Sequence, residues 1–171
     1  MPVTWQSGMR LVPARLNALP RGILGRAERT TTSPFTSAAT ELPILRLDAI
    51  PVVSGRLYHV RVVNVHIDAS AASTDMARGY LRVSTAGAAT TASTQLAAAS
   101  LPVPDTGGIA SGADIHGEYV ATATGTLSVL FSIARITGAT ANMRTLAGTG
   151  FNLELSVVDA GIDPGDTGVT L

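Results

Sequence analysis

The sequence predicts an all-β protein, an antiparallel β-sandwich or jelly roll with an extended N-terminal arm. Three observations predict it. Apolar residues alternate with polar or small ones in several runs, which is typical of strands with one buried face. Small-residue and Pro/Gly turns separate these runs, and neither helical periodicity nor βαβ alternation follows the arm. Hydrophobic residues make up 46% of the 171-residue chain, which is enough for a core. We expect about eight strands.

The chain divides into an N-terminal docking arm and linker, residues 1–41, and a β-sandwich domain, residues 42–171. The arm carries scattered apolar residues and a Thr/Ser/Ala-rich stretch around Pro34 that has little to bury. Such an arm either docks onto a neighbouring subunit or larger particle, or packs on its own β domain. The residues expected to contact a partner are Trp5, Arg10, Arg15, Leu16, Arg21, Ile23, Leu24 and Arg26.

The first half of the domain contains three expected strands. They are Leu42–Ile50, Arg56–Asp68 and Ala77–Thr85, with a corner at Pro51–Gly55 between the first two. Regular alternation in Arg56–Asp68 places apolar side chains on both faces of the strand. Val63, Val65 and Ile67 share one face, and Tyr58, Val60 and Val62 share the other. This pattern indicates a central strand or one partly buried at an interface between subunits.

The second half begins with regions of weaker signal. Residues 86–100 form a low-complexity Ala/Thr/Ser tract with a short strand near Thr94–Leu96, and Leu101–Asp114 is expected to be loop. Four further strands follow, at His116–Ala123, Thr126–Thr137, Asn142–Ala147 and Phe151–Asp159. The second and fourth of these have the clearest alternation. Their inward sets are Leu127, Val129, Phe131 and Ile133, and Phe151, Leu153, Leu155 and Val157.

Composition excludes several classes of function. The formal net charge is zero, which argues against nucleic acid as a partner. The absence of cysteine excludes disulfides, zinc–thiolate sites and a cysteine nucleophile. No apolar run reaches the roughly 18–20 residues of a membrane span, and the N-terminus lacks the apolar core of a secretory signal. We therefore expect neither a membrane nor a nucleic-acid partner.

Charge is unevenly distributed along the chain. Five arginines and one acidic residue lie within the first 29 residues, whereas the stretch from Thr145 onward has four acidic residues and no arginine. A basic arm and an acidic tail are expected where neighbouring copies attract each other head to tail. The alternative is a solvated distribution that salt screens locally.

Candidate catalytic and metal sites are weakly supported, so we expect no enzyme activity, cofactor or metal. His59 and His66 are separated by an odd number of residues and would point to opposite faces of a regular strand. No G-x-S-x-G elbow occurs, and a phosphate-binding loop is ruled out because the chain has no lysine. Three acidic groups are candidates for calcium loops, although loop capping explains the two aspartate pairs better and a Pro-Gly turn explains the last stretch better. They are Asp68 with Asp75, Asp105 with Asp114, and the stretch Asp159–Gly168.

Three stretches of the chain resemble small virion structural proteins of tailed phages that infect actinobacteria. They are W-x-S-G with P-A-R-L-N near the start, Ile50-Pro-Val-Val-Ser-Gly-Arg-Leu-Tyr58 in the middle, and Gly125–Leu130 with Glu154–Gly168 at the end. Such proteins are described as head-decoration or minor tail proteins. No catalytic residue belongs to this resemblance.

The resemblance implies a non-enzymatic virion protein that decorates and stabilises the capsid surface and is anchored through its arm. Its expected partners are other copies of itself, as a homotrimer, and the major capsid protein or other virion proteins. It would be located in the virion, assembled in the host cytoplasm. The alternatives are a minor tail protein or a tail-associated module that binds a host receptor or glycan. Aromatic residues, the usual platforms for glycans, make up only 4% of the chain.

Overall fold

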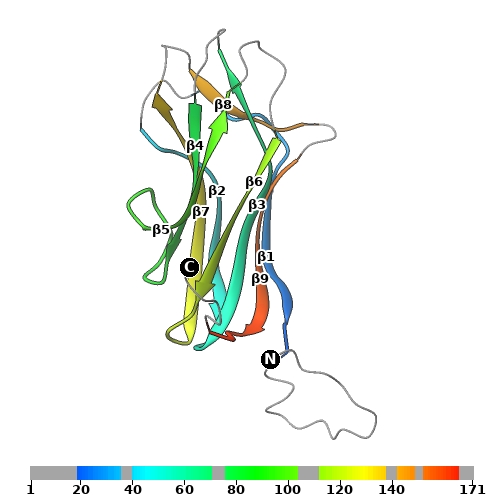
Figure 1. The fold of residues 1–171 in the computed structure, drawn as a ribbon, viewed down its shortest axis with the longest axis vertical. Helices are drawn as coiled ribbons and strands as arrows, with labels where there is room; N and C mark the ends of the chain where they lie inside the picture. The colour runs from blue at the N-terminus through cyan, green and yellow to red at the C-terminus, as the bar shows by residue number, and fades with distance from the viewer. Residues whose placement is uncertain are drawn as a thin grey trace, which may run out of the picture.

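The prediction of an all-β protein is confirmed by a computed structural model, which describes residues 19–35, 40–70, 76–103, 112–137, 142–148 and 152–165. Within these ranges the chain forms nine strands and no helix (Figure 1). The strands are β1 (Gly22–Arg29), β2 (Leu42–Val52), β3 (Arg56–Ala69), β4 (Met76–Ser84), β5 (Thr94–Pro102), β6 (Gly112–Val120), β7 (Gly125–Thr137), β8 (Met143–Leu146) and β9 (Leu153–Ile162).

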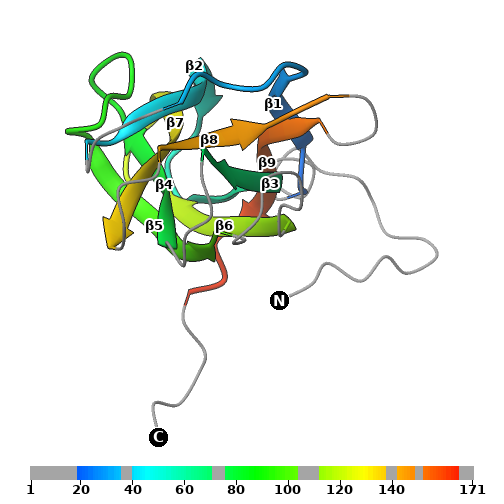
Figure 2. The same ribbon diagram turned by 90° about the horizontal axis from the view of Figure 1, so that it is seen from above.

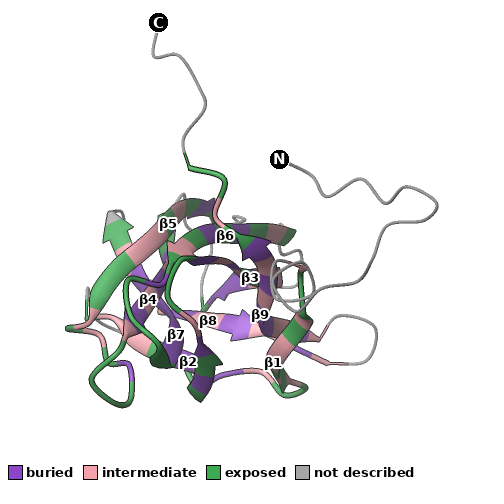
Figure 3. Ribbon diagram, turned by 90° about the horizontal axis from the view of Figure 1, so that it is seen from below, coloured by how far each residue is buried: buried purple, intermediate pink, exposed green. Residues whose placement is uncertain are grey.

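The strands form two antiparallel sheets that lie on opposite sides of one core (Figure 2). One sheet has the order β1-β9-β3-β6, with the short β8 also paired to β3. The other has the order β2-β7-β4-β5. Residues of both sheets form one buried hydrophobic cluster, and Figure 3 marks the buried residues along the strands in purple. We call these the β3 sheet and the β7 sheet after their central strands.

The first strand corrects the expected boundary at residue 42. Gly22–Arg29, which the sequence placed in the arm, pairs with β9 along the edge of the β3 sheet. Leu24 packs against the core, and an irregularity in the pairing falls between Ile23 and Gly25. The edge of β9 offers backbone N–H and C=O groups that need hydrogen-bond partners. Pairing with these groups favours a strand at Gly22–Arg29, although the side-chain pattern of that segment alone does not predict one.

The low-complexity tract contains a longer strand than expected. β5 runs from Thr94 to Pro102, and β6 begins at Gly112, so both extend into the stretch expected to be loop. β5 is held by its pairing with β4 and by Leu101, which is 2% exposed. The other strands of the domain were predicted to within a few residues.

A β-bulge in β3 corrects the expected two-faced strand. The pairing with β6 shifts register between Val62 and Val65, and Asn64 has a φ of 59°. One extra residue reverses which side of the sheet the later side chains occupy. Val65 and Ile67 therefore join Tyr58 and the other inward residues of the first half in the core. β3 is a central strand, and its apolar pattern requires no subunit interface.

β7, the central strand of the β7 sheet, is buried on both faces. Its predicted inward set is confirmed, because Leu127, Val129, Phe131 and Ile133 are each at most 1% exposed. On its outer face Leu130 lies between Arg46 and Arg82 of the neighbouring strands and is 2% exposed. The stems of arginine side chains cover apolar surface in this way while their charged ends reach solvent or a partner.

An ion pair between Arg82 and Glu41 covers the neighbouring part of the outer face of the β7 sheet. Glu41 accepts hydrogen bonds from the Arg82 guanidinium at 2.5 and 2.6 Å and one from the Ser132 hydroxyl. The hydrogen bond to Glu41 raises the pKa of Arg82 above its ordinary value. Arg82 thus stays charged, and Glu41 ties the start of β2 to β4 and β7.

Two glycines allow the sheets to approach each other at their edges. A Cβ on Gly25 of β1 would lie 2.3 Å from Cδ1 of Ile50 in β2. A Cβ on Gly117 of β6 would lie 2.8 Å from Cγ of Leu96 in β5. Both seams between the sheets therefore depend on a missing side chain.

Candidate functional site

The described chain begins and ends at the same corner of the molecule, next to the turn between β2 and β3. The Arg56 guanidinium donates a hydrogen bond of 2.6 Å to the carbonyl oxygen of Leu19, the first described residue. The backbone N–H of Asp163, near the other end, donates to the carbonyl of Gly55 at 3.1 Å. Segment 1–18 is therefore attached at this corner, beside the end of β9 (Figure 1).

A buried ion pair holds the corner together. Arg56 Nη2 lies 2.7 Å from Asp159 Oδ1, and Arg56 Nε lies 2.9 Å from Asp159 Oδ2. The two side chains are 3% and 1% exposed. Asp159 Oδ1 also accepts a hydrogen bond from the backbone N–H of Gly161, at 2.9 Å. A bidentate pair with these additional partners satisfies charges that would otherwise be costly to bury.

No local sequence pattern predicts this pair. Arg56 and Asp159 are 103 residues apart, and each belongs to a different stretch of the family resemblance. Tyr58, two residues after Arg56, is also buried, and its hydroxyl accepts a hydrogen bond of 2.7 Å from the N–H of Val53. The corner is thus built by residues from Ile50–Tyr58 together with the end of β9.

Four of the eight residues expected to contact a partner lie in the described part of the chain. Ile23 is 61% exposed, whereas Leu24 packs against the core of its own chain. Arg26 is 2.8 Å from Glu154, and Arg21 is 4.0 Å from Asp159. The other four lie outside the described residues: Trp5, Arg10, Arg15 and Leu16.

The attraction between the basic arm and the acidic tail occurs within one chain for these residues. Pairing of β1 with β9 brings Arg26 to Glu154 and Arg21 to Asp159. Arg29 donates instead to backbone carbonyls, including that of Thr31 at 2.8 Å. The uneven charge noted in the sequence therefore has an intramolecular explanation along this pair of strands, and it does not require a neighbouring copy.

The three histidines lie on the outer side of the β3 sheet, and His59 and His116 are close to each other there. The bulge at Asn64 places His66 on the same side as His59, which corrects the expectation for a regular strand. The ring of His59 lies 5.1 Å from that of His116, and His59 Nε2 lies 3.7 Å from Glu118 Oε1. Even so, no three His, Asp or Glu side chains of the described ranges are grouped closely enough to hold a metal ion.

The acidic residues that resembled calcium loops have partners where they are described. Asp68 accepts hydrogen bonds from Arg144 at 2.8 and 2.9 Å, and Asp114 accepts one from the N–H of Asn64. Asp163 accepts one from the N–H of Gly165 at 3.0 Å, which is the local pattern of an aspartate in a turn. Asp75, Asp105 and the end of the last stretch, residues 166–168, lie outside the described residues.

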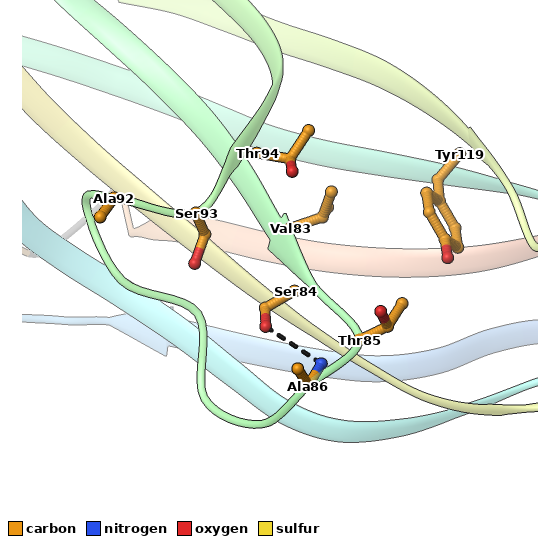
Figure 4. A pocket seen from close by; sticks show the side chains of 8 residues that line it. All are labelled: Val83, Ser84, Thr85, Ala86, Ala92, Ser93, Thr94 and Tyr119. Atoms are coloured by element: carbon orange, nitrogen blue, oxygen red, sulfur yellow. Dashed lines mark hydrogen bonds between the residues drawn. The ribbon is translucent and has the colours of Figure 1, made fainter.

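A hydroxyl-lined hollow opens between β4, the start of β5 and Tyr119 of β6 (Figure 4). Its volume is about 390 Å³. It is lined by Val83, Ser84, Thr85, Ala86, Ala92, Ser93, Thr94 and Tyr119. A second hollow of about 230 Å³ adjoins it and shares Thr85 and Tyr119. Local sequence patterns do not place Tyr119 beside these hydroxyls, because the three contributing strands are brought together only by the fold.

No family model matches the chain, and no curated protein matches it. In the segments that the structure describes, no helix is long and apolar enough to span a bilayer.

Proposed function

We propose that the chain is a non-enzymatic structural protein of a tailed-phage virion, a capsid-surface decoration protein anchored through segment 1–18. The proposal rests on the resemblance of its start, middle and end to such proteins. The single structural observation that supports it most is the corner held by Arg56 and Asp159. Two of the resembling stretches meet there, and the third leads into it through Leu19. The middle and end stretches therefore meet beside Leu19, the residue that follows segment 1–18 in the sequence.

The order of the strands supports a jelly roll. Four nested pairs of strands are hydrogen bonded: β1 with β9, β2 with β7, β3 with β6, and β4 with β5. Rolling such a nested ribbon into two four-stranded sheets gives the orders β1-β9-β3-β6 and β2-β7-β4-β5, with β8 as an addition. Jelly rolls are common in viral capsid and lectin domains, which fits the proposal at the level of analogy.

The proposed partners are the major capsid protein or other virion proteins, and further copies of this chain. Ile23, exposed at the start of β1, lies close to the point of attachment of segment 1–18. It could extend a contact that the segment makes with a neighbour. A homotrimer remains part of the proposal, but the apolar pattern of β3 no longer argues for it, because the bulge explains that pattern.

Deletion of segment 1–18 tests the anchoring role. The deleted protein is expected to fold and to lose its incorporation into particles, measured by co-sedimentation with particles assembled without the native protein. Deleting the whole expected arm, residues 1–41, would be a poor test, because it also removes β1. A variant whose first 18 residues are replaced by a Gly/Ser-rich segment of equal length controls for length alone. Unchanged incorporation of the deleted protein would contradict the anchoring role.

A further inference from the structure

The two hollows beside Tyr119 form one continuous, uncharged concave surface. They meet at Thr85 and Tyr119, which line both. The second hollow adds residues from the end of β2, the β6–β7 turn and the start of β7: Val52, Thr122, Ala123, Thr124, Gly125 and Thr126. Among the residues that the structure describes, no Asp, Glu, Arg or His lines either hollow. By contrast, the hollow on the outer side of β3 is lined by His66 and Asp114.

Hydroxyl groups dominate the polar lining, and several of them have no hydrogen-bond partner among the residues that the structure describes. Ser84, Ser93 and Thr124 accept hydrogen bonds from backbone N–H groups and are occupied in part. Five others make no side-chain hydrogen bond with the described part of the chain: Thr85, Thr94, Tyr119, Thr122 and Thr126. Each hydroxyl can donate one hydrogen bond and accept others. The surface thus offers both neutral donors and neutral acceptors.

Tyr119 gives this surface a fixed aromatic wall. Its ring packs against Tyr58 of the core, with ring centroids 6.5 Å apart. Figure 4 shows the ring at one side of the hollow, with Thr94 and Ser93 across from it and Val83 between them. The ring is therefore held in place before any ligand binds, and its hydroxyl points to the side of Thr85 (Figure 4).

We propose that this surface binds a neutral saccharide. A sugar presents hydroxyls that both donate and accept, and its C–H faces pack on aromatic rings, so it matches a wall of free hydroxyls beside a tyrosine. An anionic or cationic ligand would be left without a counter-charge. A lipid would leave the lining hydroxyls unsatisfied. A volume of about 390 Å³ is within the range of small-molecule sites. The proposal is independent of the virion role.

The test uses the full chain on a printed array that carries both neutral and acidic glycans. The strongest neutral oligosaccharide is then titrated calorimetrically against the wild type, Tyr119→Phe and Thr85→Val. Tyr119→Phe keeps the ring and removes only a hydroxyl that makes no hydrogen bond within the described chain, so the fold is preserved. We expect each variant to bind about twofold to tenfold more weakly, which is the effect of losing one hydrogen bond.

Thr31→Val is the matched control, because Thr31 is exposed and lies outside both hollows. It should bind as tightly as the wild type. Three results would overturn the proposal: binding to no neutral glycan, binding to acidic glycans alone, or equal affinity of Tyr119→Phe, Thr85→Val and the wild type. Melting temperatures of all variants confirm that they are folded.

Discussion

The guanidinium of Arg56 and the carboxylate of Asp159 form a bidentate ion pair that is almost completely buried. The pair joins the first residue of β3 to the last strand, β9, and Arg56 also holds the carbonyl of Leu19. A buried pair of this kind contributes little net stability compared with apolar residues, but breaking it leaves one charge uncompensated. The pair therefore fixes the geometry of the corner where segment 1–18 is attached.

Asp159→Asn should destabilise the fold strongly. The substitution keeps the size of the side chain but removes the carboxylate charge with which the buried Arg56 guanidinium pairs. We expect a loss of about 3–5 kcal/mol in the free energy of unfolding, measured by urea denaturation.

Asp48→Asn is the control for this experiment. Asp48 pairs with Arg46 at 2.8 Å, but the two side chains are 44% and 49% exposed. Its loss should cost no more than about 1 kcal/mol. Equal effects of the two substitutions would show that the Arg56–Asp159 pair does not hold the corner.

The bulge in β3 makes Asn64 sensitive to β-branched residues. Its φ of 59° lies in the left-handed region, which asparagine and glycine tolerate and valine does not. Asn64→Val should lower stability by about 1–3 kcal/mol in urea denaturation. Asn64→Gly should cost less, although it loses the side-chain hydrogen bond to the carbonyl of Asn152. Greater stability of the valine variant than of the glycine variant would contradict the assigned bulge.

The seam between β5 and β6 should not accept a methyl group at position 117. Gly117→Ala would place a Cβ 2.8 Å from Leu96 Cγ and 3.2 Å from Ala97 Cβ, so β5 would have to move. We expect a loss of about 1–3 kcal/mol by thermal and urea denaturation. Gly125→Ala is the matched control, because nothing lies within 4 Å of its Cβ position, and it should stay within about 0.5 kcal/mol of the wild type. Similar stability of both variants would rule out close packing at this seam.

Two truncations distinguish the contribution of segment 1–18 to stability from that of β1. A chain that starts at Leu19 retains β1 and the hydrogen bond from Arg56 to Leu19, so its melting temperature should match that of the full chain. A chain that starts at Thr30 loses β1, removes Leu24 from the core and exposes the edge of β9. It should melt at a lower temperature and aggregate. Equal melting of the two truncations would contradict the place of β1 in the sheet.

The strands with clear alternation could be predicted from the sequence, because one buried face determines the pattern. Leu127 to Ile133 is such a case, and each of its predicted inward residues is buried. β1 could not be predicted in the same way. Its residues lack alternation, and the strand forms because β9 presents an edge and Glu154 pairs with Arg26. The residues that cause β1 to form therefore lie far from it in the sequence.

The same limit applies to the bulge and to the candidate site. Asn64 adopts its conformation in contact with Asp114 and Asn152, which the sequence does not place next to it. The corner depends on Arg56 meeting Asp159, and the hollow depends on Tyr119 of β6 meeting the β4–β5 turn. Local patterns identify strands, whereas each of these features arises from the order of strands in the two sheets.

The proposed virion role is tested most directly by counting copies of the chain in purified particles, using quantitative mass spectrometry with the major capsid protein as the internal standard. A capsid-surface decoration protein should be present in many copies, at a fixed ratio to the capsid protein. A few copies per particle would favour the minor tail alternative. Absence from purified particles would contradict the virion role in either form.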